Sequence, residues 1–154
     1  MPAPQSIMRN FSFRADGSFR ICQFTDIHLD TTDLYDDYKK TFALMRRAIE
    51  DTRPDLVTIT GDLAWGQGTR KALLELGDFF AETGARWAPV LGNHDGCWTD
   101  SEIKTREEFA SILLMLPNSL FEVGPVNGNG NYCITVGDER TPEWALFFMD
   151  SHQG

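Results

Sequence analysis

Acidic, histidine and amide side chains follow three β-like segments of this chain, in positions suited to binding metal ions. Asp26 and His28 come after the first segment, Asp62 after the second, and Asn93 and His94 after the third. On an extended segment alternate side chains point to the same side, so Asp26 and His28 can hold one ion. Each residue alone has an ordinary explanation, such as a helix N-cap or a turn. Three successive groups at strand ends make coincidence improbable and predict a metal centre.

The ligand types favour two adjacent divalent cations. A carboxylate such as Asp62 has two oxygens and can bridge two ions, while the amide oxygen of Asn93 binds without adding charge. Two such cations outweigh the nearby carboxylates, so the centre stays positive and attracts a phosphate dianion. Paired metals also activate a hydroxide that attacks phosphorus. Nitrogen and oxygen ligation accepts Mn, Fe, Zn or Ni, so the ligands leave the metal open.

The surrounding pattern alternates strands and helices, which is typical of an α/β fold with a mostly parallel sheet. Strands are expected near residues 21–25, 55–60 and 87–91, with the proline at position 89 awkward for a central strand. Because ligands bind beyond the carboxyl ends of parallel strands, the three groups of candidate ligands should meet at one rim. The fold class itself therefore supports one shared site.

Helix signals separate these strands. Residues 36–50 carry apolar side chains at helical spacing, and a second helix with the same spacing should end at Gly84. Thr105 and Glu108 resemble a capping box, and the apolar face behind them runs to Leu116, before Pro117 stops the helix.

Two hairpins are expected at the margins of the chain. The Asp-Gly pair at residues 16–17 suits a tight turn between residues 10–14 and 19–25. Residues 132–136 and 144–149 resemble a second pair of strands, which would form an antiparallel margin of the sheet.

Composition limits the classes of partner. The 154 residues, 42% hydrophobic and 24% charged, suggest one globular domain rather than a disordered tail or a coiled coil. A net charge of −9 disfavours nucleic acid but allows a small phosphorylated substrate where a metal supplies positive charge. Three scattered cysteines, no leader-like N-terminus and no apolar run long enough for a bilayer predict a soluble, cytoplasmic protein without a membrane partner.

The three ligand groups lie in blocks that resemble a known family. Phe24-Thr25-Asp26-Ile27-His28-Leu29, Thr60-Gly61-Asp62-Leu63 and Leu91-Gly92-Asn93-His94-Asp95 resemble the D-x-H, G-D and G-N-H-D blocks of the calcineurin-like metallophosphoesterases. Residues 61–66, 116–120 and 130–132 resemble its purple-acid-phosphatase-like branch, and the similarity spans about residues 11–151. It implies a β-sandwich flanked by helices, in αββα layers, of which this chain forms the N-terminal half.

The resemblance also implies roles for individual residues. Asp26 and His28 would hold the first metal, Asp62 would bridge, and Asn93 would hold the second metal. His94 would protonate the leaving oxygen, with Asp95 orienting it. The implied activity is hydrolysis of a phosphomonoester or phosphodiester at a dinuclear metal centre, with a small phosphorylated molecule or a phosphoprotein as partner. Trp65 and Trp98 follow two of these loops and either wall a substrate pocket or pack in the core.

The chain departs from the family pattern after its third block. The family continues with a further histidine and a G-H-x-H block, whereas this chain has only His28, His94 and His152. We therefore expect residues 1–154 to be the N-terminal portion of a single metallophosphoesterase domain. The alternative is a catalytically incomplete fragment or a non-catalytic scaffold or binding module of the same fold. Without a covering layer, the last strands should expose apolar surface and promote self-association.

Overall fold

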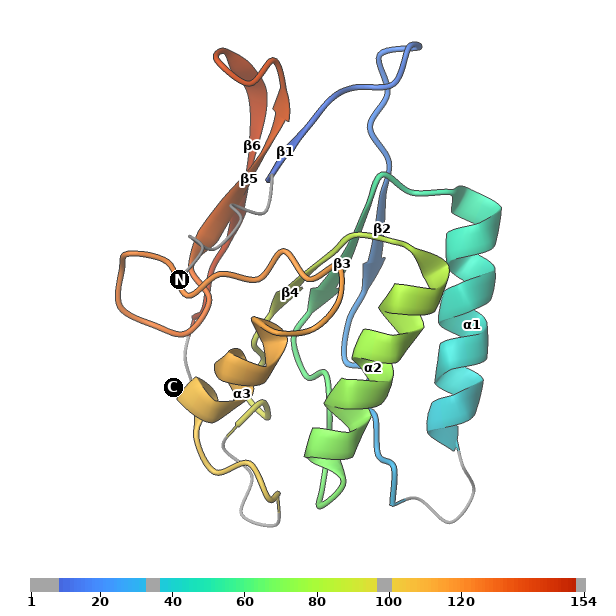
Figure 1. The fold of residues 1–154 in the computed structure, drawn as a ribbon, viewed down its shortest axis with the longest axis vertical. Helices are drawn as coiled ribbons and strands as arrows, with labels where there is room; N and C mark the ends of the chain where they lie inside the picture. The colour runs from blue at the N-terminus through green and yellow to red at the C-terminus, as the bar shows by residue number, and fades with distance from the viewer. Residues whose placement is uncertain (1–8, 33–36, 97–100, 152–154) are drawn as a thin grey trace, which may run out of the picture.

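The computed structural model describes residues 9–32, 37–96 and 101–151, which form two small sheets and the helices beside them (Figure 1). In chain order the elements are β1 (Asn10–Phe11), β2 (Ile21–Phe24), α1 (Asp37–Thr52), β3 (Leu56–Thr60), α2 (Thr69–Thr83), β4 (Trp87–Val90), α3 (Arg106–Leu113), β5 (Tyr132–Gly137) and β6 (Pro142–Phe148). No helix in these ranges is long and apolar enough to cross a membrane.

The first sheet has the order β2-β3-β4, with all neighbours parallel. Its central strand β3 is apolar and almost wholly buried, as the sequence predicts. Helices α1 and α2 cover one face of this sheet (Figure 1). Pro89 lies in β4, which is an edge strand, and an edge tolerates a residue that has no N–H to donate. The expected α/β architecture, with parallel strands flanked by helices, is therefore confirmed.

The predicted helix boundaries are partly confirmed. Gly84 ends α2 in the left-handed conformation, and its N–H bonds to the carbonyl of Phe80. Thr105 caps α3 by accepting the N–H of Glu108, as the capping pattern indicates. The helix ends at Leu113, however, and the chain reaches Leu116 through a tighter turn, so the expected extension of the helix to Leu116 is wrong. Leu116 is buried all the same.

The second sheet has the order β1-β5-β6, in which β5 and β6 are antiparallel and β1 is parallel to β5. The expected antiparallel pair therefore forms, but in a sheet of its own rather than at the margin of the first. The two sheets meet through Tyr132 of β5, whose hydroxyl donates to the carbonyl of Pro89 at 2.6 Å. The ring of Tyr132 stacks on Phe148 of β6, with centroids 4.8 Å apart.

The two segments on either side of residues 16–17 were expected to pair as a hairpin, but they do not pair with each other. The turn itself is present, since Gly17 has φ 78° and donates its N–H to the carbonyl of Arg14. Beyond it, β1 joins β5 while β2 joins β3, so the arms enter different sheets. Asp55, just before β3, holds both arms by accepting from Arg14 Nε at 2.8 Å and from the N–H of Arg20. Long-range pairing thus outweighs the local hairpin signal.

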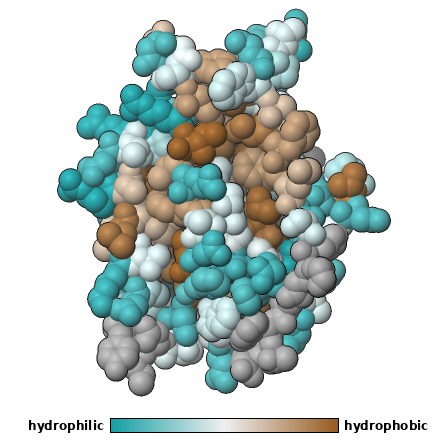
Figure 2. Space-filling model, turned by 180° about the vertical axis from the view of Figure 1, so that it is seen from behind, coloured by the Kyte–Doolittle hydropathy of each residue, from teal (hydrophilic) through white to brown (hydrophobic). Residues whose placement is uncertain are grey.

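Strand β6 carries an apolar surface that the described residues leave open. Phe147 is 72% exposed, and Trp144 and Met149 are also exposed. A groove of about 320 Å³ runs beside them, lined mainly by apolar side chains that include Val126, Cys133 and Phe147. Seen from behind, the upper part of the molecule gathers apolar side chains on its surface (Figure 2). Exposed apolar patches of this kind favour association.

We expect the 154-residue chain to associate through this surface. Its average mass in sedimentation velocity should rise with protein concentration, and Phe147→Lys should lower that rise because a charge on β6 opposes burial of the strand. Leu44→Lys is the matched control, since Leu44 on α1 is equally exposed at 72%. A mass of 17.4 kDa at all concentrations would contradict the expectation.

Candidate metal centre

The candidate ligands follow the carboxyl ends of three adjacent parallel strands. Strand β2 ends at Phe24, β3 at Thr60 and β4 at Val90, and the three loops that leave them lie at one edge of the sheet. In open α/β sheets this edge is where ligands bind. The strand register therefore brings the predicted residues of the three loops to one place.

Three of the candidate ligands have a backbone conformation that side chains disfavour. Asp26, His28 and Asp62 have φ values of 52°, 40° and 51°, and only two other non-glycine residues in the described ranges have positive φ. Such conformations cost energy and persist only where the surroundings impose them. Here the N–H of Asp26 bonds to the carbonyl of Gly61 at 3.1 Å, and that of His28 to the carbonyl of Asp62 at 2.9 Å.

This local geometry corrects one step of the sequence argument. Asp26 and His28 were expected to share one side of an extended segment, but both residues are left-handed and the chain turns there. The two side chains converge because the N–H groups of both residues donate to successive carbonyls of the loop after β3. The expected convergence is present, and its cause is hydrogen bonding between loops rather than strand alternation.

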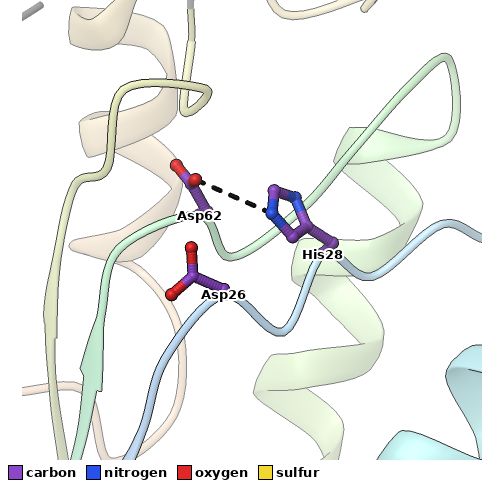
Figure 3. A group of neighbouring side chains, drawn as sticks. All are labelled: Asp26, His28 and Asp62. Carbon is purple, nitrogen blue, oxygen red and sulfur yellow. Dashed lines mark ion pairs between the residues drawn. The ribbon is translucent and has the colours of Figure 1, made fainter.

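Asp26, His28 and Asp62 form a compact ligand set. Each offers one ligand atom, and these atoms lie within 4.8 Å of one another. Figure 3 shows the two carboxylates and the imidazole facing a common space, with His28 Nε2 3.7 Å from Asp62 Oδ2. The other ring nitrogen, His28 Nδ1, is buried and has no hydrogen-bond partner among the described residues. Two carboxylates and an imidazole fit a divalent first-row metal.

The buried Asp62 joins two of the loops. Its Oδ1 accepts the N–H of His94 at 3.0 Å, while Oδ2 faces His28. The carboxylate lies directly against Gly92, where an added Cβ would come within 2.1 Å of Oδ1. An added Cβ on Gly61 would lie 2.9 Å from the Cα of Gly92. Both glycines are therefore required for the loops after β3 and β4 to meet around this carboxylate.

His94 lies beside the ligand set. Its ring centroid is 5.7 Å from that of His28, and Trp65 packs edge-on against both rings, at 4.7 Å from His94 and 5.2 Å from His28. The indole thus packs beside the candidate ligands, and its role as the wall of a substrate pocket stays a prediction. Asn93 precedes His94 in the same loop and is exposed. Its role as ligand of a second ion stays a prediction.

Asp95 is wholly buried below these loops. Its Oδ1 accepts the N–H of Leu63 at 2.9 Å and its Oδ2 the N–H of Gly92 at 2.8 Å, so it ties the loop after β3 to the loop after β4. Burial raises the pKa of Asp95 to about 7, and the charge of Asp62 acts in the same direction, against the lowering by the backbone N–H groups. The orientation of His94 by Asp95 stays a prediction.

Sequence reasoning missed Thr25, whose hydroxyl donates to the carboxylate of Asp26 and so fixes it. The only signal for this role was a hydroxyl residue next to a candidate ligand. Trp98, the other candidate for the wall of a substrate pocket, lies outside the described residues, as does His152.

Gly92→Ala tests the close approach to Asp62. The added methyl group should displace the carboxylate, and Mn²⁺ binding measured by calorimetry should weaken by about 10–100-fold, as when ligand-orienting contacts are lost. Gly84→Ala provides the control, because Gly84 has φ 68° and open space around it. That variant should lower the midpoint of thermal unfolding without changing Mn²⁺ affinity. Equal affinities in Gly92→Ala and wild type would refute the steric argument.

Comparison with known proteins agrees with this geometry. The family model described as calcineurin-like phosphoesterase matches residues 19–150. The chain is 32% identical to "Probable inactive purple acid phosphatase 28" of Arabidopsis thaliana, over 90% of this chain and 43% of that protein. It is 30% identical to "Phosphatase DCR2" of Saccharomyces cerevisiae, over 90% of this chain and 27% of that protein.

A third relative, "Probable inactive purple acid phosphatase 29" of Arabidopsis thaliana, is 28% identical over 97% of this chain and 45% of its own length. The chain thus spans less than half the length of each of these curated relatives. The family match covers most of the chain and includes all three loops of the site. The chain belongs to the calcineurin-like phosphoesterase family.

Proposed function

We propose that this chain provides the metal-binding loops of a centre that hydrolyses phosphoesters. The observation that supports this most directly is the convergence of Asp26, His28 and Asp62 within 4.8 Å, with the His94 loop bonded to Asp62. The four residues come from the loops after β2, β3 and β4. Asp26, His28 and Asp62 also adopt positive φ values, which cost energy. Strain concentrated at one cluster of polar side chains is typical of a functional site rather than of a solvated surface.

In this proposal Asp26, His28 and Asp62 hold a first divalent ion, and Asp62 with Asn93 holds a second. The two oxygens of Asp62 already face different partners, Oδ2 the His28 side and Oδ1 the His94 loop, as a bridging carboxylate requires. Divalent ions supply the positive charge that draws a phosphate to a chain of net charge −9, and they lower the pKa of water. Mn, Fe, Zn and Ni all suit these ligands.

His94 is the proposed proton donor to the leaving oxygen of a phosphomonoester or phosphodiester. Its ring lies within 5.7 Å of the His28 ring and packs against Trp65, which limits solvent on that side. A histidine held beside a phosphate can protonate an alkoxide as it leaves. Either a small phosphorylated molecule or a phosphoprotein offers this chemistry.

A second candidate function is a metal-binding module that does not catalyse. Two observations favour it: the names of two of these relatives include the word "inactive", and the sequence has only three histidines to act as ligands or acids. Both candidates require the ion held by Asp26, His28 and Asp62. Turnover therefore distinguishes them, and metal binding does not.

A reducing, cytoplasmic setting is part of the same proposal. Cys22 and Cys133 are free thiols in the structure, and Cys97 lies outside the described residues. Burial raises the pKa of the Cys22 thiol, which keeps it protonated and unreactive.

Asp62→Asn should weaken metal binding more than any other single ligand change, because the two oxygens of Asp62 face His28 and the His94 loop. We expect Mn²⁺ binding in calorimetric titration to weaken by more than about 100-fold. Asp78→Asn, an exposed carboxylate on α2, removes the same charge elsewhere and should leave binding unchanged. Equal Mn²⁺ affinity in both variants would show that Mn²⁺ binds by non-specific attraction to an acidic surface and not at Asp62.

His94→Ala separates catalysis from metal binding. In assays with alkyl phosphomono- and diesters across a panel of divalent metals, turnover should fall by about 10²–10⁴-fold while Mn²⁺ affinity stays within a factor of about two. The loss should be smaller for nitrophenyl esters, whose leaving group needs no proton. Intact metal binding with no metal-dependent turnover in the wild-type chain would favour the non-catalytic module.

A further inference from the structure

A buried ion pair lies behind the metal centre and joins parts of the fold that the site does not otherwise use. Arg106, the first residue of α3, places its Nη2 2.5 Å from Oδ1 of Asp150, which follows strand β6. The Arg106 side chain is 10% exposed and that of Asp150 is fully buried. The pair therefore links a helix beside the first sheet to the end of the second sheet.

The same guanidinium also holds the loop that carries Asn93 and His94. Its Nη1 donates to the carbonyl of Gly92 at 2.7 Å and to that of Asp95 at 3.3 Å. The guanidinium therefore bonds to the loop just before Asn93 and just after His94. Gly96, with φ 81°, packs directly on the helix, since an added Cβ would lie 2.8 Å from the Cα of Arg106.

Asp150 is in turn fixed by the segment before β5. Its Oδ2 accepts the N–H of Asn129 at 2.7 Å, and its own N–H donates to the side-chain oxygen of Asn131 at 2.9 Å. A continuous chain of hydrogen bonds therefore runs from the Asn129–Asn131 segment through Asp150 and Arg106 to the carbonyls of Gly92 and Asp95. From there the loop reaches Asp62 through the N–H of His94.

Stability alone is a poor reason for this arrangement. Burying an ion pair rarely stabilises a fold more than apolar side chains of similar size would. Arg106 Nε is buried without a hydrogen-bond partner among the described residues, and a cation at a helix N-terminus opposes the helix dipole. What the pair does provide is a fixed position for two backbone carbonyls that flank His94.

We propose that Arg106 and Asp150 are positioning residues, which hold the Asn93–His94 loop against Asp62 and couple the second sheet to the metal centre. The functional consequence rests on the proposed function, whereas the positioning itself concerns the protein without metal. Loosening the pair lets His94 move away from Asp62 while Asp26 and His28, held by the loop after β3, stay in place.

Arg106→Lys is the most informative change, because lysine keeps the positive charge beside Asp150 but has no planar fork to reach Gly92 and Asp150 together. Asp150→Asn is the second variant, which keeps an acceptor but removes the charge. Arg14→Lys is the matched control: Arg14 also pairs with an aspartate, Asp55, at 2.8 Å, but beside the start of β3, at the end of the strand away from the site.

The first measurement is amide hydrogen exchange by NMR without metal. The His94 N–H, which bonds to Asp62, should exchange about tenfold faster in Arg106→Lys and Asp150→Asn, while the amides of β3 keep their wild-type rates. Arg14→Lys should leave His94 unchanged. Wild-type exchange at His94 in both test variants, or equal acceleration throughout β3, would overturn the proposal, since the pair would then have no local role.

The second measurement uses Mn²⁺, whose unpaired electrons broaden the resonances of nearby rings. With only three histidines in the sequence, the imidazole signals are few enough to assign. Mn²⁺ should broaden His28 and His94 together in the wild-type chain, and His28 far more than His94 in Arg106→Lys. Equal broadening of both rings in that variant counts against the proposal. If wild-type His28 is not broadened, the metal centre itself fails, and the exchange rates alone decide the positioning role.

Discussion

The contact between the loops after β3 and β4 is the constraint on which the rest of the site depends. Gly61 and Gly92 pass so closely that a side chain on either would collide with the other loop, and the Asp62 carboxylate fills the space beside them. The strand register produces this contact, because Thr60 pairs with Val90 and each loop starts directly after its strand. A shift of this register would separate Gly61 from Gly92, and the two loops would no longer meet around Asp62. The sheet and its two helices therefore serve to align two short loops.

Sequence patterns predicted the elements whose signals are local or that lie in the core. Strand β3 is recognisable because burial on both faces leaves it almost no polar residue except threonine. The cap at Thr105 and the stop at Gly84 involve hydrogen bonds within a few residues, so their residue types identify them. The hairpin around residues 16–17 failed for the opposite reason. Its turn is local, but the two arms pair with distant strands, β1 with β5 and β2 with β3.

The convergence of Asp26, His28 and Asp62 was predictable, and the way the protein holds them was not. Aspartate, histidine and asparagine after successive strands indicate a metal site from chemistry alone. The left-handed backbone of Asp26 and His28 depends on carbonyls of Gly61 and Asp62, which no pattern near residue 26 reveals. Arg106 acts on backbone carbonyls too, so it belongs to no metal motif. The one signal was a cation at the start of a helix, where helices favour acids.

The fold divides the work of the site unequally between its two sheets. Asp26, His28 and Asp62 follow strands of the first sheet, so that sheet with its helices brings together the three candidate ligands. The second sheet contributes none of these three residues, and Asp150 with Arg106 connects its end to the loop of His94. The three candidate ligands and the side chains that hold the His94 loop therefore come from different parts of the fold.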